Sequence, residues 1–99
     1  MSRELRLSPR AWADLQDAVR SCDEDRAGRG AELTAAVERA LGELASARDH
    51  GAPWKDGLPY HARAIDGFPY VVFHTLQGNA VLVLAVANLE RRRGYGSDG

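Results

Sequence analysis

Ninety-nine residues, 44% of them apolar and 27% charged, match an ordinary globular domain, so we expect one domain over residues 1–99 and no second one. The formal net charge of -1 counts against a surface that binds nucleic acid strongly along its whole extent. The single Cys22 excludes an internal disulfide, and no segment resembles a signal peptide or a membrane span, so a cytoplasmic protein is expected.

The first predicted elements are a strand and a helix. Residues 3–7 alternate polar and apolar side chains, which predicts a short strand with its two leucines on the buried face. Ser8 and Pro9 follow as a helix N-cap and a first helical residue, where proline loses no hydrogen bond. We therefore predict a helix over residues 9–21. Its buried face should hold the apolar residues at helical spacing, namely Trp12, Leu15, Val19 and Cys22.

A second helix is predicted over residues 31–50, after a polar connection that contains glycine. Gly51 suits the left-handed position after the last helical turn, and Pro53 prevents continuation. The two helices should form an antiparallel hairpin. The residues that share the apolar face of the second helix are Leu33, Val37, Leu41 and Leu44.

No regular element is expected in residues 51–59, which hold two glycines and two prolines and are predicted to form a surface loop. Residues 60–65 alternate in a way that is compatible with a strand. Asp66 and Gly67 then form the turn that leads into the next strand.

A β-hairpin follows, and the rest of the chain is organised around it. Two runs rich in β-branched and aromatic residues flank Gly78 and Asn79, which accept the positive φ angles that a two-residue turn requires, so Gln77 faces Ala80. Both faces are largely apolar, and the hairpin should therefore lie inside the sheet and not at its edge. Counting outward predicts the pairs Thr75–Leu82, Phe73–Leu84 and Val71–Val86 on one face, and Leu76–Val81, His74–Val83 and Tyr70–Ala87 on the other.

The predicted order is thus strand, helix, helix and three further strands. This order is typical of an α+β fold in which a two-helix hairpin packs on one face of a small, mainly antiparallel sheet. The first strand is expected to join the sheet of the hairpin. The polar residues 94–99 are expected to form a flexible tail.

No pattern predicts a metal or a cofactor. His50, His61 and His74 lack ligand spacing and have no cysteine partners, and the chain has no glycine-rich phosphate loop, no Ser-His-Asp arrangement and no paired carboxylates. His61 and Arg63, two residues apart on one strand face, could present two cationic donors to a phosphate, or could simply belong to an exposed face. His74 is expected to be a packed strand residue, with an acid or base as the alternative.

The most prominent charged feature is Arg91-Arg92-Arg93, with Tyr95 close behind, directly after the last strand. A strand end holds side chains on a rigid scaffold and leaves them accessible. A guanidinium cluster beside a phenol is suited to holding a phosphodiester and assisting proton transfer, or to docking an acidic partner segment. A solvated strand end is the alternative explanation.

Together these motifs resemble the RelE/ParE superfamily of bacterial toxins, which includes proteins described as plasmid stabilisation proteins. The resemblance covers nearly the whole chain. It implies the toxin of a type II toxin-antitoxin pair. RelE-like members cut messenger RNA on the ribosome without metal, through basic residues and a tyrosine or histidine, whereas ParE-like members inhibit DNA gyrase. The resemblance rests on the order of elements and on the segments Leu7–Trp12, Phe68–Phe73, Val81–Val86 and Arg91–Tyr95.

Departures from the family pattern favour gyrase over RNA as the target. RNA-cleaving relatives usually have an arginine at the position of Val71. Related sequences have a histidine at the position of Asn88, which cannot titrate near neutral pH. The candidate catalytic residues are Arg91, Arg92 and Tyr95, and the candidate target- or phosphate-binding residues are His61, Arg63, His74 and Arg93.

The sequence therefore predicts a toxin that inhibits growth through DNA gyrase. The alternatives are a metal-independent, ribosome-dependent mRNA endonuclease and an inactive, toxin-derived binding module. The expected partners are a cognate antitoxin, in a toxin-antitoxin hetero-oligomer, and either gyrase or the ribosome with its mRNA. Neither a membrane partner nor a cofactor is expected.

Overall fold

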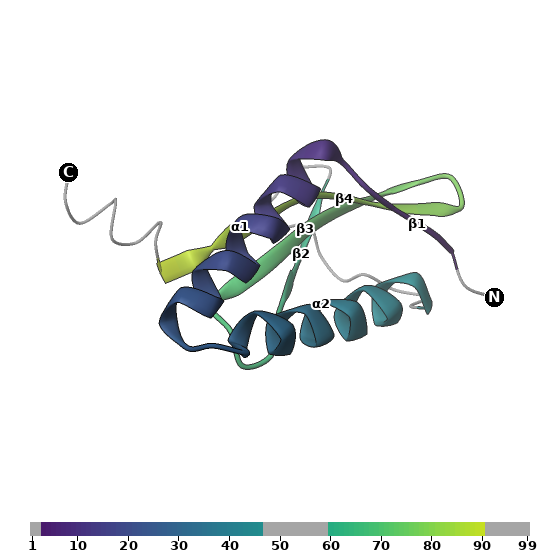
Figure 1. The fold of residues 1–99 in the computed structure, drawn as a ribbon. Coiled ribbons are helices and arrows are strands. Elements are labelled where there is room, and N and C mark those ends of the chain that lie inside the picture. The colour runs from purple at the N-terminus through teal and green to yellow at the C-terminus, as the bar shows by residue number, and fades with distance from the viewer. Residues whose placement is uncertain (1–2, 47–59, 91–99) are drawn as a thin grey trace.

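The computed structural model describes residues 3–46 and 60–90. Figure 1 shows two helices packed on one sheet, with α1 running alongside the C-terminal half of β4. This is the predicted α+β arrangement. The elements in chain order are β1 (Glu4–Leu7), α1 (Pro9–Asp25), α2 (Arg29–Ser46), β2 (His61–Ala64), β3 (Tyr70–Gln77) and β4 (Ala80–Asn88).

The four strands form one mixed sheet in the order β1-β4-β3-β2. The β3–β4 hairpin occupies the two central places, which confirms the prediction from its two apolar faces. β1 joins the sheet as expected and pairs with β4 in the parallel sense, with Leu5 opposite Val81 and Leu7 opposite Val83. β2 forms the other edge and pairs with β3 in the antiparallel sense.

The predicted hairpin register is correct near the turn. Gln77 pairs with Ala80, and the pairs that involve Thr75, Leu76 and His74 are also as predicted. Of the two turn residues only Gly78 has a positive φ, of 56°, which is the pattern of a type II′ turn.

Beyond His74 the predicted register is wrong by one residue, because β4 contains a bulge. Leu84 is the extra residue, and a hydrogen bond of 2.9 Å from the Ser8 hydroxyl to the Leu84 carbonyl fixes it from outside the hairpin. The extra residue also changes which later side chains of β4 face the helices. Val86, and not Ala85, joins Val81 and Val83 in the core. The corrected pairs are Phe73–Ala85, Val71–Ala87 and Tyr70–Asn88.

Helix α1 begins as predicted and ends later. The Ser8 hydroxyl accepts a hydrogen bond from the Ala11 amide at 3.0 Å, and Pro9 follows as the first helical residue. Asp23, Glu24 and Asp25 lie beyond the predicted end and continue the helix to Asp25. The Arg26 amide closes the last turn on the Cys22 carbonyl at 3.1 Å.

The predicted buried face of α1 is partly wrong. Trp12 is 54% exposed, whereas Cys22 is buried as expected and Leu15 and Val19 are half-buried against the core. The side chains that are buried most completely are Ala11 and Ala18. These small residues allow α1 to pack closely on β4. Trp12 follows Ala11 directly, so its side chain points about 100° around the helix axis from the buried direction of Ala11.

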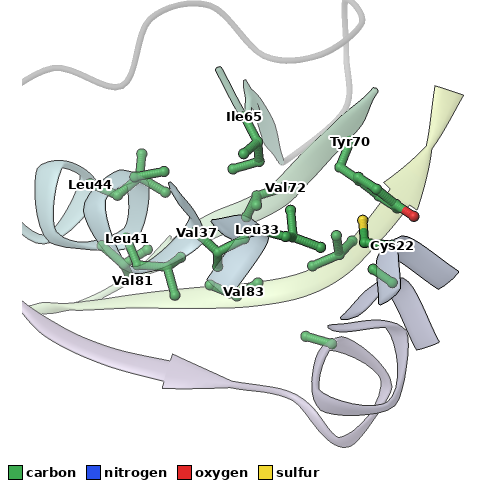
Figure 2. Close-up of a cluster of buried hydrophobic side chains, with 14 residues drawn as sticks. Cys22, Leu33, Val37, Leu41, Leu44, Ile65, Tyr70, Val72, Val81 and Val83 are labelled. Atoms are coloured by element: carbon green, nitrogen blue, oxygen red, sulfur yellow. The ribbon is translucent and has the colours of Figure 1, made fainter. Parts of the chain in front are cut away.

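Helix α2 supplies most of the helical core, as predicted. Leu33, Val37, Leu41 and Leu44 are all buried, and Figure 2 shows them beside Val72, Val81 and Val83 of the sheet, with Cys22 and Tyr70 at the other end of the cluster. Neither helix of the described chain is both long and apolar enough to cross a membrane.

Three predictions lie outside the described residues. They are the last turn of the second helix with its Gly51 cap, the surface loop 51–59 and the flexible tail 94–99. The turn at Asp66 and Gly67 is described and is confirmed, with a φ of 84° at Gly67.

Candidate functional site

The two faces of the sheet differ in what covers them. Strand alternation places Tyr70, Val72 and His74 of β3 on the face that packs against the helices, opposite Asn88, Val86 and Val83 of β4. Val71 and Phe73 alternate with them and lie on the opposite face. The predicted site residues can therefore be assigned to a face from the register.

His61 and His74 form a cross-strand pair on the helix-facing side. They are opposite each other on β2 and β3, and their rings stack with centroids 5.5 Å apart and planes at 27°. His74 is only 1% exposed, whereas His61 is half-buried. The expectation that His74 is a packed strand residue is confirmed, and its ring is closed off from solvent.

Arg63 lies two residues beyond His61 on the same face. Its guanidinium forms an ion pair with the Glu43 carboxylate of α2, and both side chains remain about half exposed. Glu43 thus holds the one arginine of β2 against the helical layer. A phosphate at this position would have to compete with that carboxylate.

The face opposite the helices carries no charge from β3 or β4. Val71 is 3% and Phe73 9% exposed, and Tyr60 meets Phe73 edge to face at a centroid distance of 5.7 Å. Ala85 and Ala87 of β4 lie beside them and are half-buried. The position at which RNA-cleaving relatives have an arginine is therefore occupied here by a buried valine.

The arginine cluster begins just beyond the end of β4. Arg91, Arg92, Arg93 and Tyr95 lie outside the described residues, so their assignment as a site stays a prediction. What is described is the support: β4 is a central strand, and Leu89 continues its pairing through a hydrogen bond of 2.9 Å from its amide to the Pro69 carbonyl.

A cleft beside the C-terminal half of β4 was not predicted. It has a volume of about 460 Å³ and lies between α1 and the strand. Its position depends on the bulge and on the angle of α1, and neither of these can be recognised in the sequence. The one sequence feature that relates to the cleft is the spacing of Arg10, Asp14 and Asp17, which places them along one flank of the helix. The residues that line it are Arg10, Asp14, Asp17, Ala18, Tyr70, Phe73, Ala85, Val86, Ala87 and Asn88.

The charged groups of this cleft are tied to the fold. The Asp14 carboxylate accepts a hydrogen bond from the Val86 amide at 3.0 Å and lies 3.5 Å from the Arg10 guanidinium. Within the described part of the chain, no three His, Cys, Asp or Glu side chains gather in a way that could hold a metal ion. The arrangement is suited to binding a polypeptide or a polar group.

Comparison with known proteins agrees with this fold. The family model described as "ParE toxin of type II toxin-antitoxin system, parDE" matches residues 5–93. A solved structure described as "Chromosomal ParDE TA system from P. aeruginosa" is similar with a TM-score of 0.77 and 12% sequence identity, and the match covers 89% of this chain and 97% of that chain. No curated protein sequence matches.

Proposed function

This chain belongs to the ParE toxin family of type II toxin-antitoxin systems, and we propose that it stops bacterial growth by inhibiting DNA gyrase. The observation that carries the proposal is the family match over residues 5–93. We further propose that it acts in the cytoplasm and that a cognate antitoxin holds it inactive in a hetero-oligomer.

The positions of three side chains support gyrase over RNA cleavage. Val71 is buried in the face opposite the helices, where a nuclease of this superfamily would need a cation beside the scissile phosphate. His74 is buried in the sheet, and Arg63 is paired with Glu43. A metal-independent nuclease needs an accessible base and free cations around the ribose 2′-hydroxyl.

We propose that the arginine cluster is the functional centre, with Arg91, Arg92 and Tyr95 making the decisive contacts. Arginine offers planar, bidentate donors to carboxylate or phosphate, and the rigid central strand β4 ends three residues before Arg91. Gyrase, RNA and an acidic antitoxin segment all present anions, so the same cluster would serve for inhibition and for neutralisation.

Controlled expression in bacteria tests the target. A gyrase inhibitor should halt DNA replication and induce the DNA-damage response while total mRNA stays intact, and the purified protein should block supercoiling by gyrase. Rapid cleavage of transcripts on ribosomes, with supercoiling unaffected, would replace this proposal by the nuclease. Full growth in the presence of a folded protein would favour an inactive binding module.

A pair of double variants tests the site. Arg91→Ala with Arg92→Ala should abolish growth inhibition and leave the melting temperature nearly unchanged. Arg20→Ala with Arg39→Ala removes the same charge from exposed positions of α1 and α2 and should keep full toxicity. A folded Arg91/Arg92 variant that is still fully toxic would place the functional centre elsewhere.

A further inference from the structure

β1 covers only the first half of the edge of β4. It pairs with Ala80 to Val83 and then ends, because the chain turns into α1 at Ser8. The Ser8 amide and hydroxyl bond to the carbonyls of Val83 and Leu84 at 3.0 and 2.9 Å and close the edge at that point. No described strand pairs with residues 85–87 on this side of β4.

The backbone of Val86 points out of this open edge. Ala85 and Ala87 pair with Phe73 and Val71 of β3, and strand alternation directs the groups of the residue between them away from β3. The Val86 amide accordingly reaches the Asp14 carboxylate at 3.0 Å, and its carbonyl shares the same outward direction. The Asp14 carboxylate, and not the backbone of a neighbouring strand, thus accepts the hydrogen bond of the Val86 amide at this edge.

The cleft of about 460 Å³ lies along this edge and has two unlike walls. Asp14 and Asp17 of α1 stand on one side, and the small side chains of Ala85 and Ala87 leave room on the other. The positive charge on the described lining is Arg10, whose side chain is 77% exposed and lies at 3.5 Å from Asp14. Arg20 of the same helix lies 3.5 Å from Asp17. Ion pairs that involve such exposed arginines contribute little, so a cation of a partner could compete for both carboxylates.

We propose that this cleft binds an extended segment of a partner protein, which adds to β4 as a fifth strand of the sheet. Its central amide would donate to the Val86 carbonyl, while the Val86 amide keeps its hydrogen bond to the Asp14 carboxylate. A lysine or arginine at that position would face Asp14 and Asp17, and the apolar residues before and after it would face Ala85 and Ala87. Added strands gain affinity from main-chain hydrogen bonds and specificity from alternate side chains. A helix fits this site less well, because it offers no backbone donors to a strand edge.

The proposal concerns a binding surface and does not depend on the toxic target. It predicts that recognition follows backbone pairing and charge, in a segment that alternates basic and apolar residues. Both properties can be tested separately with short peptides and the whole protein.

The probe is the acetylated and amidated peptide Thr-Val-Lys-Val-Thr, added to the isotope-labelled full chain and followed by NMR. We expect the amide signals of residues 85–88 to shift in a saturable way. The same peptide with an N-methyl group on the central residue should not bind, because it cannot donate at that position. A peptide with glutamate in place of lysine should bind more weakly.

Two variants test the charge. Asp17→Asn should weaken binding of the lysine peptide by about two- to fivefold, as expected for one exposed ion pair. Asp14→Asn, which keeps an oxygen for the Val86 amide, should weaken it similarly. Glu38→Gln, an exposed carboxylate change on α2, should have no effect.

Three results would overturn the proposal. They are the absence of saturable shifts at residues 85–88, equal binding of the N-methylated peptide, and shifts confined to the exposed Trp12 face of α1. If shifts appeared only after removal of residues 91–99, the site would belong to the chain's own C-terminal segment and not to a partner.

Discussion

Replacing Ser8 by alanine tests the junction at which β1, α1 and β4 meet. The hydroxyl accepts a hydrogen bond from the Ala11 amide at 3.0 Å and donates one to the Leu84 carbonyl at 2.9 Å. Losing an N-cap costs about 0.5–2 kcal/mol, and losing a typical intramolecular hydrogen bond costs about 0.5–1.5 kcal/mol. We therefore expect Ser8→Ala to lower the free energy of unfolding by about 1–3 kcal/mol.

Urea denaturation of matched serine variants measures this effect. Ser46 is an exposed serine near the end of α2, and its hydroxyl donates to the Gly42 carbonyl of the same helix at 3.1 Å. Ser46→Ala should change the free energy of unfolding by less than about 0.5 kcal/mol, because the site is on the surface and alanine favours the helix. Ser8→Thr keeps a hydroxyl in place and should retain most of the stability.

The comparison also tests the account of the bulge. If Ser8→Ala and Ser46→Ala melted alike, the hydroxyl would not hold Leu84, and the shifted register of β4 would need another cause. If Ser8→Ala and Ser8→Thr lowered the free energy of unfolding equally, side-chain volume and not hydrogen bonding would explain the loss.

Three further predictions follow from packing and charge. Leu41→Ala should lower the free energy of unfolding by about 2–5 kcal/mol in a urea melt, because Leu41 is 8% exposed in the core; a loss below 0.5 kcal/mol would show that α2 does not pack as described. Gly42→Ala should stabilise by up to about 1 kcal/mol, since open space surrounds that position, whereas Gly30→Ala should destabilise because its Cβ would lie 2.7 Å from a side-chain oxygen of the preceding helix. Arg26 lowers the pKa of Glu32 by hydrogen bonding to its carboxylate, so the NMR titration of that carboxyl should have its midpoint below the ordinary value of a glutamate. The stabilisation should be complete above the pKa of the unfolded chain and lost as the pH falls through the lowered pKa, and Arg26→Gln should move the midpoint up.

Local chemistry was sufficient to predict the order of the elements and the inner position of the β3–β4 hairpin in the sheet. The turn at Gly78 fixed the register as far as His74, because cross-strand pairs follow from a two-residue turn without further information. The bulge at Leu84 could not be predicted in this way. It is held by Ser8, 76 residues away, and a hairpin sequence contains no trace of so distant a hydrogen bond.

The error at Trp12 has a related cause. Helical spacing places Trp12 near Leu15 and Val19, and a large apolar side chain looks like a core residue. The structure instead buries Ala11 and Ala18, because α1 lies close enough to β4 to admit only small side chains. Hydrophobic size alone does not report how near two elements approach each other.

The candidate site could be predicted only in part. The sequence places His61 and Arg63 on one strand face, as the structure has them, but cannot show that Glu43 of another element neutralises the arginine. The cleft beside β4 is formed by the end of β1, the bulge and the angle of α1 together. Each depends on tertiary contacts, so no single stretch of sequence predicts it.

The parallel pairing of β1 with β4 also sets the order in which the sheet can be completed during protein synthesis. β1 leaves the ribosome first, yet its only neighbour among the described strands is the last one made, and their contact at Ser8 and Leu84 spans 76 residues. At bacterial elongation rates of about 5–20 residues per second, this interval takes about 4–15 s. Throughout that time the nascent chain cannot form the finished sheet, and a polypeptide released before β4 has emerged leaves β1 with no strand to join.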